Sequence, residues 1–103
     1  MSKFYIKWHK NPYTIPSNPE EMAKLLMTML EWVKAEKKAG LFTDWGVCVD
    51  ASSGYCIAEG DEASLHSQLL KYQPHIVFDI KPVISVDQAI ESIKKAVAAA
   101  KGR

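Results

Sequence analysis

The most restrictive feature of the sequence is a strict alternation of residue type in residues 3–9, close to its start. Large apolar side chains, Phe4, Ile6 and Trp8, fall on one side of an extended chain, and the other side carries Tyr5, Lys7 and His9. A strand with this pattern buries one of its faces only. It is therefore typical of an antiparallel sheet that is covered on one side.

The rest of the chain supplies three more strands and three helices. Asn18 and Pro19 are typical of a helix start, and Gly40 is typical of a helix end. Apolar residues recur at helical spacing between these points. The same reasoning predicts further strands at 42–49, 55–59 and 76–84, and further helices at 62–72, capped by Asp61, and at 88–100, capped by Asp87.

This order predicts an α+β protein of the ferredoxin-like class. A β-α-β-β-α-β arrangement forms one four-stranded antiparallel sheet with helices on one face. Right-handed crossovers place the first and third strands at the centre of the sheet. We expect a single domain over residues 1–103, with a core at 3–85 and an additional C-terminal helix at 87–101.

The composition limits the classes of partner. The formal net charge of +1 argues against a nucleic acid or an anionic membrane as the main partner. No apolar run approaches the length of about 20 residues that spans a bilayer, and the N-terminus lacks a secretory signal pattern. We therefore expect a cytoplasmic location. Cys48 and Cys56 have no neighbouring ligands at metal-binding spacing, so neither a metal nor another cofactor is expected.

Several short segments resemble a known group of domains. The segments are FYIKW near the start, GYCIAEGDEASL at 54–65, YQPH at 72–75 and FDIKPVI at 78–84. Together they resemble the muconolactone isomerase-like domains of the dimeric α+β barrel superfamily, many of whose members have no established activity. The resemblance implies a homodimer in which two sheets face each other across a shared interior.

The central hairpin provides a second argument for a dimer. If the hairpin pairs about Ser52, Val47 lies opposite Ile57, and Cys48 lies opposite Cys56. The small residues then face the helices, and we expect both cysteines to be buried. The uncovered face of the sheet then carries an apolar patch, which monomers rarely expose. The predicted homodimer interface consists of Trp45, Val47, Tyr55 and Ile57.

The uncovered face also carries the candidate site. A small ligand in the shared interior would contact Tyr5, Lys7, Tyr55, Glu59 and Asp79. Because strands one and three are expected to be neighbours, Lys7 and Glu59 are predicted to lie within reach of each other. His9 and Glu59 are the candidates for proton transfer. The alternative interpretation is structural, with Lys7 paired to Asp79 or Glu59.

Three functions are compatible with these residues. The first is a homodimer that binds a small apolar or aromatic acid between its sheets. The second is a cofactor-independent isomerase or monooxygenase that acts on a small cyclic acid, an activity suggested by the resemblance. The third is a structural dimer with a filled interior. The sequence does not decide whether the protein is an enzyme, or which ligand it binds.

Overall fold

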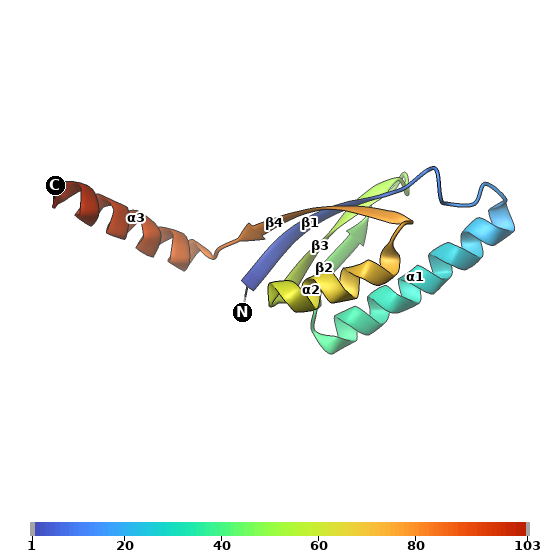
Figure 1. The fold of residues 1–103 in the computed structure, drawn as a ribbon, viewed down its shortest axis with the longest axis horizontal. Helices are drawn as coiled ribbons and strands as arrows, with labels where there is room; N and C mark the ends of the chain where they lie inside the picture. The colour runs from blue at the N-terminus through green and yellow to red at the C-terminus, as the bar shows by residue number, and fades with distance from the viewer. Residues whose placement is uncertain (1, 103) are drawn as a thin grey trace.

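The computed structural model describes residues 2–102, in which helices cover one face of an antiparallel sheet (Figure 1). The elements are, in chain order, β1 (Ser2–Lys10), α1 (Pro19–Ala39), β2 (Phe42–Val47), β3 (Ser53–Gly60), α2 (Glu62–Leu69), the 3-10 turn η1 (Leu70–Tyr72), β4 (Ile76–Val83) and α3 (Val86–Lys101). The sheet has four strands in the order β2-β3-β1-β4, and neighbouring strands are antiparallel. This confirms the predicted α+β class, with β1 and β3 at the centre.

Both ends of α1 form as the sequence predicts. The Asn18 side chain accepts hydrogen bonds from the backbone N–H groups of Glu20 and Glu21, at 3.0 and 3.2 Å. Gly40 ends the helix in the left-handed conformation, with φ of 89°. Glycine adopts this conformation without the steric cost that a Cβ would add.

The start of α3 differs from the prediction. Ser85, and not Asp87, is its N-cap, because the Ser85 hydroxyl accepts from the Gln88 N–H and the Gln88 side chain accepts from the Ser85 N–H. This reciprocal pair is a capping box. Asp87 lies in the first helical turn, where its negative charge interacts favourably with the positive end of the helix dipole.

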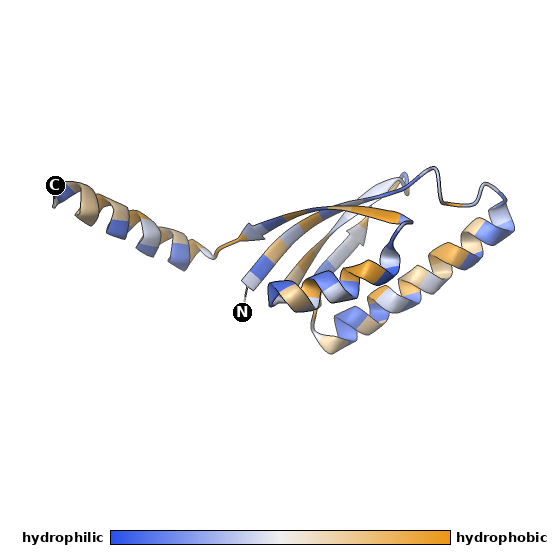
Figure 2. Ribbon diagram, viewed as in Figure 1, coloured by the Kyte–Doolittle hydropathy of each residue, from blue (hydrophilic) through white to orange (hydrophobic). Residues whose placement is uncertain are grey.

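The face assignment of β1 is confirmed. Phe4, Ile6 and Trp8 lie under the helices with exposed fractions of 4%, 0% and 8%. Apolar residues recur along α1 and α2 (Figure 2), and the buried ones among them include Met29, Val33, Leu65 and Leu69. The remaining core residues are Met29, Val33, Phe42, Cys56, Ala58, Leu65, Leu69, Tyr72 and Ile76. The sheet thus has a helix face, which is buried, and an open face on the side away from α1 and α2.

The predicted pairing of the β2–β3 hairpin is wrong. Val47 pairs with Gly54, and Trp45 pairs with Cys56. A register shift between Phe42 and Asp44 marks Thr43 as the extra residue of a bulge. Because a bulge changes which residues share a side of the strand, Phe42 and Trp45 both lie on the helix face.

Aromatic packing explains this register. Trp8 and Trp45 stack on the helix face with ring centroids 5.5 Å apart. Gly54 lies beneath the Trp8 ring, and a Cβ at this position would lie 2.3 Å from Trp8 Cζ2 and 2.2 Å from the Gly46 carbonyl oxygen. Only a glycine leaves room for the indole ring at this point of the hairpin.

Helix α3 stands apart from the rest of the molecule. It continues beyond the end of β4 and projects away from the sheet and from α1 and α2 (Figure 1). The described chain measures 64 by 25 by 23 Å as a result. Within residues 2–102, no helix has both the length and the apolar character needed to cross a membrane.

We predict that Gly54→Ala destabilises the fold by about 1–3 kcal/mol, because the added methyl group forces the Trp8 ring out of its position. Chemical denaturation measures this difference. Gly102→Ala is the matched control: its Cβ would come no closer than 3.5 Å to the neighbouring atoms that surround it, so its effect should stay within about 0.5 kcal/mol. Equal stability of the two variants would contradict the close packing of Trp8 on Gly54.

Candidate functional site

The five residues predicted to bind a ligand lie on strands whose open face they share. Lys7 on β1 pairs with Tyr55 on one side and with Asp79 on the other. Tyr5 pairs with Ile57 and Lys81. The orientation inferred from the alternation of β1 is therefore correct, and Tyr5, Lys7 and His9 lie on the side away from the helices.

The expected proximity of Lys7 and Glu59 is wrong. Glu59 pairs with Lys3, and the positions of Lys3 and Lys7 are about 13 Å apart along a strand. His9 pairs with Ser53 at the opposite end of β3, about 20 Å along the sheet from Glu59. The two candidates for proton transfer therefore do not meet at one reacting group.

Tyr55 is held at the β2 edge of the open face. Its hydroxyl donates a hydrogen bond to Asp44 Oδ2 at 2.9 Å. This bond to a carboxylate raises the pKa of Tyr55, because it favours the protonated phenol. The Tyr55 ring also lies over Gly46, where a Cβ would come within 2.5 Å of Tyr55 Cε1. Tyr55 therefore has a local structural partner.

The residues predicted to form the dimer interface divide between the two faces. Trp45 and Val47 lie on the helix face, as the pairing of β2 with β3 shows. Tyr55 and Ile57 remain on the open face. Their neighbours on that face include charged residues from three strands: Lys3, Lys7, Asp44, Asp79 and Lys81. The open face is therefore more polar than the sequence analysis expected.

An apolar cavity lies on the other side of the sheet, between the helix face and α1. Its volume is about 250 Å³. Its walls are predominantly apolar, and include Trp8, Met29, Val33, Phe42, Trp45 and Phe78. Leu30 and Val47, which are 38% and 50% exposed, lie where the cavity opens to solvent. A cavity of this kind is suited to a small apolar or aromatic molecule.

Tyr72 is one of the residues that line this cavity. Its ring packs edge-on against Trp32 and Phe78, with centroid separations of 5.5 and 6.0 Å. Its hydroxyl oxygen is buried and has no hydrogen-bond partner among the residues that the structure describes. Burial raises the pKa of Tyr72, and the nearby negative charge of Glu36 raises it further. The hydroxyl therefore stays protonated at neutral pH and can donate a hydrogen bond.

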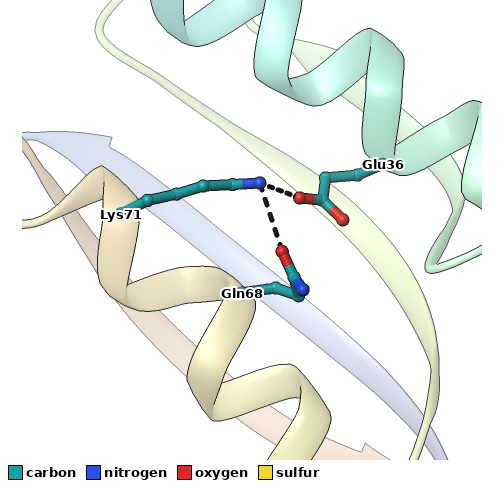
Figure 3. Close-up of polar contacts among 3 residues, drawn as sticks. All are labelled: Glu36, Gln68 and Lys71. Atoms are coloured by element: carbon teal, nitrogen blue, oxygen red, sulfur yellow. Dashed lines mark hydrogen bonds and ion pairs between the residues drawn. The ribbon is translucent and has the colours of Figure 1, made fainter.

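An ion pair with one buried partner connects α1 to the segment that carries Tyr72. Glu36 of α1 is only 5% exposed, and its carboxylate pairs with the ammonium group of Lys71 in η1 (Figure 3). The same ammonium group donates to Gln68 Oε1 at 3.2 Å. These contacts connect α1 to η1 directly beside Tyr72. Loss of Lys71 would leave the buried Glu36 carboxylate without its partner, which costs more than the pair itself contributes.

The two cysteines occupy different environments. Cys56 lines the cavity and is 1% exposed, as predicted. Burial raises the pKa of its thiol to about 12, so the thiol is protonated and unreactive at neutral pH. Cys48 is exposed, and the prediction that it is buried is wrong because β2 ends at Val47.

Sequence reasoning missed the two polar residues of the cavity. Tyr72 lies at the end of the second predicted helix, and no feature of the sequence indicates that its hydroxyl is unpaired. Lys10 lines the cavity, and its place two residues after Trp8 predicts the same orientation. We find no cluster of three His, Cys, Asp or Glu side chains suited to a metal ion in the part of the chain that the structure describes.

We predict that the native protein has one reactive thiol and one protected thiol. Titration with a thiol reagent at pH 8 should label Cys48 rapidly, because it is exposed, and should label Cys56 only after denaturation. Cys48→Ser is the control, and this variant should show no rapid labelling. Rapid modification of Cys56 in that variant would contradict its place in the cavity wall.

One protein-family profile matches the chain. A search of curated proteins found no match. The profile of the family described as domain of unknown function DUF3303 matches residues 2–97. This match covers nearly all of the sequence, including every strand and most of α3. The protein belongs to the DUF3303 family.

Proposed function

We propose that this protein binds a small apolar or aromatic molecule in the cavity between α1 and the sheet. One observation carries the proposal: the cavity of about 250 Å³ beneath α1 has apolar walls that include the rings of Trp8, Phe42 and Phe78. A cavity with walls of this kind suits a small apolar or aromatic molecule.

The chemistry of the walls narrows the ligand class. Trp8, Phe42 and Phe78 provide flat apolar surfaces that suit an aromatic or cyclic ring. Lys10 provides a positive charge on the cavity lining, and it suits a carboxylate that stays partly in water. The ligand class we propose is therefore a small apolar or aromatic acid, the class that the sequence analysis gives for a binding protein. The proposed site is on the helix face of the sheet instead of the open face.

The polar groups of the cavity favour binding over catalysis. Burial raises the pKa of both Tyr72 and Cys56, and both groups stay protonated near pH 7. Neither supplies a general base or a thiolate nucleophile under these conditions. The isomerase or monooxygenase alternative would require another group, and His9 lies on the opposite face of the sheet. A homodimer through the open face stays a prediction of the resemblance.

We predict that the cavity binds anilinonaphthalene sulfonate, an aromatic acid whose fluorescence rises in apolar surroundings. Leu30→Trp should abolish binding because the larger ring fills the opening of the cavity. Lys10→Gln should raise the dissociation constant about three- to tenfold, through the loss of one partly exposed charge contact.

Lys7→Gln is the matched control for Lys10→Gln, because it removes the same charge from the same strand on the open face. Its dissociation constant should equal that of the wild type. Weaker binding by Lys7→Gln alone would place the ligand on the open face, and the absence of saturable binding to the wild type would overturn the proposal.

We predict that Tyr72→Phe raises the free energy of unfolding of the unliganded protein by about 1 kcal/mol, because it removes a buried donor without a partner. Tyr55→Phe is the control, and it should leave the stability unchanged or lower it, because it removes the bond to Asp44. Urea denaturation measures both values. A loss of stability in Tyr72→Phe would show that the hydroxyl makes a stabilising contact and would contradict its lack of a partner.

A further inference from the structure

Helix α3 carries an apolar stripe that nothing in the described chain covers. None of its residues is buried, and Ile90, Ile93 and Val97 are 45%, 63% and 48% exposed. Apolar residues recur along the helix as it projects from the body (Figure 2). Exposed apolar rows of this kind are typical of interaction surfaces.

The spacing of the stripe indicates what covers it. Its members are separated alternately by four and three residues: Val86, Ile90, Ile93, Val97 and Ala100. This seven-residue repeat of the larger apolar residues is typical of a coiled-coil seam, and the small Ala89 and Ala96 beside it allow a second helix to approach closely. The stripe therefore fits a second helix better than it fits a sheet or a groove.

We propose that α3 pairs in antiparallel orientation with α3 of a second copy of this chain. A two-fold axis relates the helices, so each contact occurs twice. The alignment that brings both seams into register places Ile90 beside Ile93 of the second copy, and Val86 beside Val97 of the second copy. All of the larger apolar residues of both seams are then covered.

The charges beside the seam favour the antiparallel orientation. Asp87 follows the seam residue Val86, and Lys94 follows the seam residue Ile93, so both charges flank the seam on the same side. In the antiparallel alignment, Asp87 of each helix lies near Lys94 of the other helix. In a parallel pair, the equivalent positions would face Ala89 and Ala96, which offer no charge.

The helix length sets the strength of the association. Sixteen residues make a helix of about 24 Å, so the contact is small for a stable interface. We therefore expect a dimer that dissociates on dilution. A competing partner for the apolar stripe of α3 is the apolar groove between α2 and β4. Leu69, Leu70 and Ile80 help to line this groove.

The test is a charge exchange in the full chain, measured by sedimentation velocity over a range of concentrations. The wild type should show a concentration-dependent doubling of mass. Asp87→Lys and Lys94→Asp should each raise the dissociation constant about tenfold, because each sets like charges against each other. The double variant Asp87→Lys with Lys94→Asp should restore the dimer, because it exchanges the two charges and keeps each pair.

Two further variants complete the design. Lys95→Asp makes the same charge change as Lys94→Asp on the same helix away from the seam, and it should leave the dimer intact. Ile93→Asp should give a monomer, because pairing would bury a charge without a partner. Circular dichroism checks that each variant remains folded.

A strictly monomeric wild type at millimolar concentration overturns the proposal. A dimer that persists in Ile93→Asp shows that another surface, such as the open face of the sheet, forms the interface. Failure of the double variant to restore a dimer that both single variants weaken overturns the antiparallel alignment and favours the groove between α2 and β4.

Discussion

The two faces of β1 determine the organisation of the molecule. β1 forms hydrogen bonds with both β3 and β4, so its alternation sets the orientation of residues on both neighbours. Ile6, with no exposed surface, lies at the middle of this arrangement. A shift of β1 by one residue would bring Lys7 under the helices and move Trp8 to the open face. The cost of burying Lys7 without a partner excludes that register.

The strand order and three of the four strand faces could be predicted because they follow from local signals. Caps, prolines and alternating residues define β1, β3, β4 and the ends of α1. The facing of β2 could not be predicted, since it depends on the bulge at Thr43 and on contacts between strands. Trp8 packs over Gly54 on the helix face, and Tyr55 packs over Gly46 on the open face. Each glycine thus accommodates an aromatic ring from a neighbouring strand, a relation that a single sequence does not reveal.

The cavity was missed for a related reason. Its walls come from α1, η1 and the helix face of the sheet, and its shape depends on how far α1 lies from the strands. The Glu36–Lys71 pair connects α1 to η1 at one side of the cavity. Lys71 was visible in the sequence as a polar residue near a helix end, and Glu36 as one of several charges on α1. Their pairing is a tertiary contact, and it explains why a glutamate occupies a buried position on the helix.

Helix α3 lacks the packing against the sheet that stabilises the other helices. α1 and α2 are stabilised by packing on the sheet, and most helices depend on such packing. α3 has a capping box at Ser85 and an exposed ion pair between Glu91 and Lys94 at 3.9 Å, which contribute little each. An isolated helix of this length is marginal in water. Pairing with a second copy would therefore stabilise the helix as well as cover its seam. Because α3 projects from the body, this coupling of helix formation to association would leave the cavity beneath α1 unchanged.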